Sequence, residues 1–239
     1  MAPARLTVLA SVSLLALLSL TDLLSPPISP TISRQTQTYA QTAHFVESGF
    51  AFDGLRIDID GAKPFHLAYE FPLYQTIVGV LFAAFGFAFI WGKLVSLAAA
   101  LIAVGVFARL VSQWYPETVA RRAALFMASS PITLLLSTAF QPDALAVALG
   151  AAAAMALLWW RQTQTLARWL VFLLLLLAAA LAKFVVLVPF TPFFIALLLR
   201  HGRRWRMPTI PELVSGLLVV VLPFLAWNLY RLTLIDPRL

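Results

Sequence analysis

Cysteine is absent from this chain of 239 residues. The absence excludes a disulfide framework, a thiol nucleophile and a metal site built on cysteine. Charge is also scarce, since Asp, Glu, Lys and Arg together make up 11% of the sequence. Soluble domains carry about a quarter of such residues. Hydrophobic residues make up 62%, and the two proportions together exclude an ordinary soluble domain.

Long hydrophobic runs occupy most of the chain, and each is long enough, or nearly so, to cross about 30 Å of hydrocarbon as a helix. They do not alternate apolar and polar residues, which excludes membrane strands. We therefore predict an all-α, polytopic transmembrane protein with about seven spans. The expected helices lie near 6–25, 91–113, 122–140, 143–161, 166–183, 185–200 and 212–231. The first run is expected to be an uncleaved span, with a cleaved signal peptide as the alternative.

The net charge of +7 does not predict nucleic-acid binding, because the basic residues stand in short loops between the spans. The apolar segment 71–90 decides the topology. If it makes no net crossing, ten of the seventeen Lys and Arg residues share one face, as the positive-inside tendency expects. We therefore predict that 71–90 is a re-entrant or interfacial helix. The segment 26–70, Asp143 and Lys183 then lie together on the non-cytoplasmic side.

The segment 26–70 is a long outer loop that stands out from the rest of the sequence. Between Arg34 and Glu70 it holds five of the ten acidic residues. Its part 35–48 mixes polar residues with Tyr39, Ala43 and Phe45, which predicts a helix lying on the membrane surface. A chain that only had to sit in a bilayer has no need of such a loop, so we expect binding or chemistry there.

Four acidic residues are candidates for catalysis. Asp58 and Asp60 alternate on an extended stretch and share a face, so they suit a divalent metal ion or a general base; a solvated turn is the alternative. Glu70 stands where the loop re-enters the apolar phase, either as a boundary residue or as a partly desolvated acid. Asp143 follows Pro142 at the mouth of a span, where it can cap a helix and still present an oxygen outward.

Three basic residues are candidates for binding an anion. Arg34 begins a set of hydrogen-bonding groups suited to phosphate or sugar hydroxyls, with a generic amphipathic helix as the alternative. Lys183 interrupts an apolar stretch and is placed at the outer interface by a helix boundary, where it reaches an anionic headgroup or an ordinary lipid phosphate. Lys93 has the same two readings at the outer end of the second span.

The order of these segments resembles the GT-C superfamily of membrane glycosyltransferases, which use polyprenyl-phosphate sugars. The chain resembles the protein mannosyltransferases and the aminoarabinose transferases, and is similar to glycosyltransferase family 39. The resemblance runs from about residue 5 to about 200. It rests on the order of Glu70-Phe71-Pro72-Leu73-Tyr74, Phe85-Gly86, Gly92-Lys93-Leu94-Val95-Ser96, Ala128-Ser129-Ser130-Pro131, Gln141-Pro142-Asp143 and Leu181-Ala182-Lys183.

The resemblance implies an inverting transfer of a hexosyl or pentosyl group. An acid of the first outer loop deprotonates the acceptor hydroxyl, and Asp143 helps bind the acceptor or a metal. Arg34, Lys183 and Lys93 hold the donor phosphate. Many relatives carry an Asp soon after the first span, whereas this chain has Arg34-Gln35-Thr36-Gln37-Thr38 there. The base is then Asp58, Asp60 or Glu70, and the metal, if one is bound, is held by Asp58, Asp60 and Asp143. The residues expected to bind substrate are Gln35, Gln37, Tyr39 and His66.

The predicted protein is a single transmembrane domain, residues 1–239, that resembles the N-terminal module of the family. A minimal module, a truncated gene that lacks a C-terminal part, and one half of a complex are the alternatives for its short length. Its expected partners are a polyprenyl-phosphate-linked sugar, a lipid, glycan or protein acceptor, and membrane lipids, with no nucleic acid. We expect it in the plasma (inner) membrane of the cell envelope. The alternatives are a transporter or lipid flippase subunit, which is disfavoured by the absence of repeated halves, and an inactive partner subunit.

Overall fold

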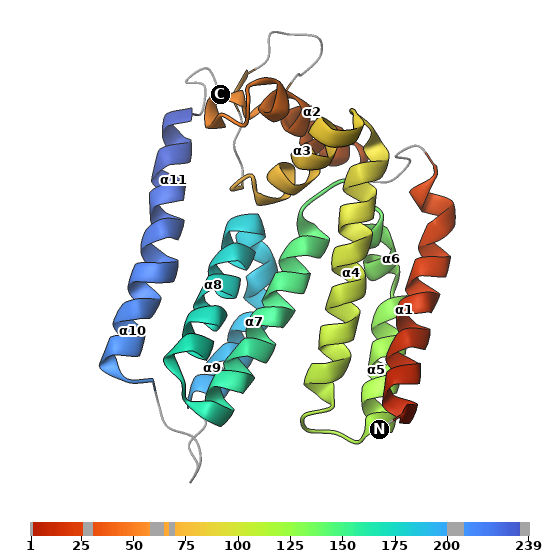
Figure 1. The fold of residues 1–239 in the computed structure, drawn as a ribbon, viewed down its shortest axis with the longest axis vertical. Coiled ribbons are helices and arrows are strands. Elements are labelled where there is room, and N and C mark those ends of the chain that lie inside the picture. The colour runs from red at the N-terminus through yellow and green to blue at the C-terminus, as the bar shows by residue number, and fades with distance from the viewer. Residues whose placement is uncertain (1, 26–30, 58–64, 67–69, 200–207, 235–239) are drawn as a thin grey trace.

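The computed structural model describes residues 2–25, 31–57, 65–66, 70–199 and 208–234. These form a bundle of upright helices with two helices lying across one end (Figure 1). The α-helices are α1 (Ala2–Leu23), α2 (Ile32–Glu47), α3 (Leu73–Phe85), α4 (Phe89–Val111), α5 (Glu117–Ser129), α6 (Pro131–Ser137), α7 (Asp143–Thr163), α8 (Leu166–Lys183), α9 (Thr191–Leu199), α10 (Ile210–Gly216) and α11 (Leu222–Leu234). Shorter elements are the 3-10 turns Phe52–Gly54 and Phe184–Phe190, the π-helical turn Leu217–Val221, and the strands β1 (Arg56–Ile57) and β2 (Phe65–His66).

Within the described residues, four helical stretches are long and apolar enough to cross a membrane, or five if a bent pair counts as one span. The four are Phe89–Val111, Asp143–Thr163, Leu166–Leu199 and Ile210–Leu234. The predicted all-α, polytopic class is therefore confirmed, whereas the count of about seven spans stays a prediction.

The stretch Leu166–Leu199 doubles back on itself. The last residue of α8, Lys183, forms an ion pair with Asp143 at the start of α7. At the other end of α7, the guanidinium of Arg161 donates a hydrogen bond to the carbonyl of Leu198 at 3.3 Å. The chain thus rises through α8 and returns through α9. Lys183 has φ −168° and ψ 97°, an extended conformation that breaks the helix between the two.

The helix predicted at 122–140 is wrong in its bounds. The structure has α5 and α6 instead, bent by 61° about Ser130. The cause is Pro131, which has no N–H to donate and disfavours helical geometry at the residue before it. Ser130 accordingly has φ −63° and ψ 131°.

Two buried clusters hold the bundle together. One lies between α7, α8 and α9, where Trp160 and Trp169 both donate to Glu212 at the start of α10, the first to its carboxylate and the second to its carbonyl. The other lies between α1, α4, α5 and α7 and consists largely of alanine. Small side chains let helices approach closely in a membrane, where backbone contact replaces the hydrophobic driving force of water.

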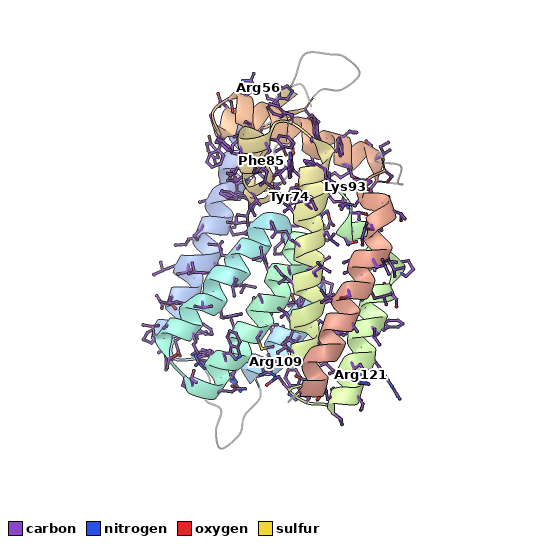
Figure 2. All side chains as sticks on the ribbon, turned by 45° about the vertical axis from the view of Figure 1, so that its right-hand side comes forward. Arg56, Tyr74, Phe85, Lys93, Arg109 and Arg121 are labelled. Atoms are coloured by element: carbon purple, nitrogen blue, oxygen red, sulfur yellow. The ribbon has the colours of Figure 1, made fainter. Side chains whose placement is uncertain are left out.

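One end of the bundle carries α2, α3, Asp143 and Lys183, and we call it the loop end. Arg109 and Arg121 lie at the opposite end, while Arg56, Tyr74 and Lys93 lie at the loop end (Figure 2). Both ends of α3 stay at the loop end, as expected of a segment that makes no net crossing (Figure 1). Whether it enters hydrocarbon stays a prediction.

Packing of α3 against α4 is tight around Phe140, which precedes α7. Tyr74, Val78, Phe82 and Phe140 form one buried cluster. The hydroxyl of Tyr74 donates to the carbonyl of Gly92 at 2.8 Å, and burial raises the pKa of this hydroxyl above its ordinary value. The ring of Phe140 lies where a side chain at Gly92 would be, since a Cβ there would come within 2.2 Å of the ring. These contacts hold the segment that leads into Asp143.

Candidate functional site

Arg34 and Glu70 form an ion pair at the loop end. Arg34 lies in the first turn of α2, and Glu70 stands three residues before α3. One guanidinium nitrogen donates to both carboxylate oxygens, at 2.7 and 2.6 Å. The two side chains are 26% and 15% exposed, so the pair is partly shielded from solvent. The pair therefore fixes where the carboxylate of Glu70 lies.

Lys183 and Asp143 form a second ion pair between the end of α8 and the start of α7. The ammonium group donates to both carboxylate oxygens, at 2.8 and 2.7 Å. Asp143 is the first residue of its helix and Pro142 takes the cap position, so its side chain is committed to Lys183 rather than to capping. A carboxylate here also favours the positive end of the α7 dipole.

The two ion pairs meet at one cavity. The backbone N–H of Phe71 donates to the carbonyl of Leu181 at 3.1 Å, which ties the residue after Glu70 to the end of α8. The cavity has a volume of about 300 Å³, and both Glu70 and Lys183 line it. Its other walls are Phe71, Ala180, Leu181, Phe184, Val185, Phe224, Trp227, Asn228 and Arg231. The structure thus brings together four of the predicted site residues. Glu70 and Lys183 line the cavity, and each is held by an ion pair, with Arg34 and Asp143 respectively.

Helix α11 supplies a wall that the sequence analysis missed. Trp227, Asn228 and Arg231 all line the cavity from this helix. A signal was present, because an Arg and an Asn on an otherwise apolar span are functional candidates by default. With Arg231 included, the site holds three basic side chains, Arg34, Lys183 and Arg231, against two acidic ones, Glu70 and Asp143. Basic side chains on the wall of a cavity suit an anionic ligand.

Lys93 lies elsewhere, although it was expected to bind phosphate. It is 2% exposed, and its ammonium group donates to the carbonyls of Asp22 and Ser25 at 2.6 and 2.8 Å. These carbonyls are at the C-terminal end of α1, where a cation satisfies both the free carbonyls and the helix dipole. The geometry therefore gives Lys93 a part in holding α1 to α4.

Gln35 is a buried residue of α2 and does not line the cavity. Its side-chain carbonyl accepts the backbone N–H of Phe140 at 3.0 Å, and its amide donates to Thr31 at 3.2 Å. Gln37 is partly exposed. Tyr39 stacks on Phe89, with ring centroids 4.6 Å apart. Roles for these three in substrate binding stay predictions.

Three predicted site residues, His66, Asp58 and Asp60, belong to the segment between α2 and α3. The backbone of His66 pairs with that of Arg56 in the β1–β2 ribbon. Asp58 and Asp60 lie outside the described residues. In the part of the chain that is described, no three His, Asp or Glu side chains cluster in a way that could hold a metal ion. The metal prediction, which depends on Asp58 and Asp60, stays open to experiment.

A model of a known protein family matches most of the chain. Residues 66–227 match the family model of dolichyl-phosphate-mannose-protein mannosyltransferase. The match includes Glu70, Asp143, Lys183 and Trp227, while Arg34, Asn228 and Arg231 lie outside it. No curated protein and no solved structure matches the chain. Because the match covers well over half of the sequence, the chain belongs to the dolichyl-phosphate-mannose-protein mannosyltransferase family and is a membrane glycosyltransferase of the GT-C type.

Proposed function

We propose that this chain moves a sugar from a polyprenyl-phosphate donor to an acceptor hydroxyl at the loop-end cavity. The observation that carries the proposal is the meeting of an acid, Glu70, with two basic residues, Lys183 and Arg231, in the wall of one cavity. Transfer needs a base for the acceptor and a cation for the leaving group. Both kinds of group are present on a cavity between membrane helices, where a lipid-linked substrate arrives from the bilayer.

Lys183 and Arg231 suit the phosphate of the donor. When the bond between the anomeric carbon and the phosphate oxygen breaks, its electron pair and a negative charge pass to the phosphate. Fixed cations lower the energy of that state, because they lie in place before the charge develops. Arg binds phosphate through paired donors, whereas Lys acts as a point charge. Asp143 then acts as a positioning residue that holds the ammonium group of Lys183.

Glu70 suits the base. Its carboxylate takes the proton of the acceptor hydroxyl, and the acceptor oxygen forms a new bond to the anomeric carbon from the face opposite the phosphate. Inversion at that carbon follows. Arg34 orients the carboxylate through two hydrogen bonds. Asp58 and Asp60 are the other candidates for the base, from the same outer loop.

We place the protein in the plasma membrane, and the arrangement of charge supports a non-cytoplasmic active face. Three arginines lie in helical turns next to short connections at the end of the bundle opposite the cavity: Arg109 at the end of α4, Arg121 near the start of α5 and Arg168 near the start of α8. Such connections are cytoplasmic by the positive-inside tendency. A seven-span topology agrees with this arrangement. The loop end, with its cavity, then faces outward.

A donor assay tests the proposal. Membranes holding the protein are given dolichyl phosphate mannose with a labelled sugar, and transfer to lipid, glycan and protein fractions is measured for Glu70→Gln, Asp60→Asn and Asp143→Asn. The control is Glu47→Gln, an exposed acid of α2. We expect loss of at least a hundredfold for the base and partial loss for Asp143→Asn. Full activity in Glu70→Gln would contradict the assignment of Glu70 as the base, and loss of activity in Asp60→Asn alone would move that role to Asp60.

A further inference from the structure

Among the residues that the structure describes, Trp227 carries a buried hydrogen-bond donor without an acceptor. The side chain is 7% exposed, and its indole N–H finds no partner in the described part of the chain. Other tryptophans of this protein differ, since the indole N–H of Trp160 donates to Glu212 and that of Trp169 to Ser215. Buried polar groups are almost always paired, and an orphan in a native protein calls for an explanation.

The position of Trp227 provides the explanation. It lines the same cavity as Glu70, Lys183 and Arg231. Trp227 and Arg231 are four residues apart on α11, so they share a face of that helix. An indole N–H only donates and cannot rotate independently of its ring, so it selects an acceptor oxygen at one place. A donor of this kind beside a ligand cavity is matched by an oxygen of the ligand.

Neighbouring rings hold the indole in place. Phe71 packs edge-on against Trp227 with ring centroids 5.0 Å apart and planes at 79°. Phe52 contributes a second contact at 5.6 Å. Both rings come from the segment between α1 and α3, so Trp227 is one of the residues of α11 against which that segment packs. The direction of its N–H is therefore set before any ligand binds.

The cavity wall has a charged part and an apolar part, which suit different parts of a ligand. Lys183 and Arg231 offer charge to a phosphate, while Phe71, Phe184 and Phe224 offer apolar faces. A volume of about 300 Å³ is at the small end of ligand cavities and suits one sugar-phosphate head group. A sugar ring has C–H faces for aromatic walls and hydroxyl oxygens that accept hydrogen bonds.

We infer that Trp227 recognises the sugar of the lipid-linked donor, with its indole N–H donating to one sugar hydroxyl oxygen. This inference rests on the proposed function and adds the residue that selects the sugar. It predicts that Trp227 contributes to binding of the sugar and contributes nothing to binding of the phosphate or the lipid tail.

The test compares two probes on the purified full chain in nanodiscs: dolichyl phosphate mannose and dolichyl phosphate without a sugar. Trp227→Phe keeps an aromatic ring and removes the N–H, and Trp114→Phe, at an exposed position after α4, is the matched control. We expect Trp227→Phe to weaken binding of the mannose-bearing probe about tenfold, the worth of one ordinary hydrogen bond. Binding of dolichyl phosphate should not change.

Other outcomes separate the two proposals. Wild-type affinity of Trp227→Phe for both probes, or an equal loss for both, overturns the sugar contact while the donor site stands. Failure of the wild-type chain to bind either probe overturns the proposed function and the inference with it. A third measurement needs no substitution: donors lacking one mannose hydroxyl at a time are bound to the wild-type chain, and one of them should lose about tenfold. Equal binding of all of them overturns the inference.

Discussion

The side-chain carbonyl of Gln35 accepts a hydrogen bond from the backbone N–H of Phe140 at 3.0 Å, across 105 positions of sequence. The contact joins α2, in the segment after the first helix, to the turn that leads into Asp143. Ser96 holds the same turn from α4, since its hydroxyl donates to the carbonyl of Ala139 at 2.6 Å. The position of Asp143, and through it that of Lys183, thus depends on residues that do not line the cavity.

Gln35→Ala should lower both stability and turnover. The N–H of Phe140 is buried and would lose its acceptor, which costs about 1–3 kcal/mol. Thermal unfolding in detergent measures the loss, and Thr36→Ala, an exposed neighbour whose hydroxyl bonds only to its own helix, is the control. A Gln35→Ala protein as stable as the control would show that the contact does not hold the turn.

Asp143 and Lys183 should be energetically coupled. Each single variant, Asp143→Asn or Lys183→Met, leaves a partly buried charge without its partner, whereas the double variant removes both charges. A double-mutant cycle on unfolding should therefore give a coupling of about 0.5–3 kcal/mol. Additive effects of the two substitutions would argue that the ion pair contributes nothing to the stability of the fold.

Gly92→Ala should destabilise the protein because the new Cβ would come within 2.2 Å of the Phe140 ring. Overpacking of this kind costs about 1–3 kcal/mol. Gly216→Ala is the control, since its Cβ would meet only the side chain of Leu173, at an ordinary 3.8 Å. Alanine is favoured over glycine inside a helix, so the control should be as stable as the wild type or more so. Equal unfolding temperatures for both variants would refute the packing account.

Arg231→Gln should raise the donor concentration needed for half-maximal transfer. The substitution removes a charge from the cavity wall, and a hydrogen bond to a charged group contributes about 1.5–3 kcal/mol. We expect KM for dolichyl phosphate mannose to rise about tenfold or more. Arg122→Gln, an exposed position at the other end of the bundle, should leave KM unchanged. The prediction fails if the two variants show the same KM.

Thiol labelling tests the sidedness, since the chain has no cysteine of its own. Glu47→Cys places one thiol at the loop end, and Gln113→Cys places one after α4 at the opposite end. An impermeant reagent added outside intact cells should label the first and spare the second. Labelling of the second alone would reverse the topology and put the cavity on the cytoplasmic face.

Much of the architecture was predictable because the bilayer restricts the possibilities. Apolar runs of the right length must be helices, and the arginine distribution indicated that 71–90 does not cross. The break at Lys183 was also predictable, since a lysine in the middle of hydrocarbon is costly. The helix predicted at 122–140 was wrong because that prediction followed the apolar run, which continues through Ser130 and Pro131. It did not take into account that proline disfavours helical geometry at the residue before it.

The sequence by itself determined a polytopic helical membrane protein and the residue types capable of its chemistry. It named Arg34, Glu70, Asp143 and Lys183 without showing which would pair with which. Only the tertiary structure decided that Arg34 binds Glu70 and Lys183 binds Asp143, and that Trp227 and Arg231 of α11 complete the cavity. The physical reason is that hydrophobic length and charge distribution are local properties of a chain. The pairing of charges and the shape of a cavity depend on how helices distant in sequence pack together.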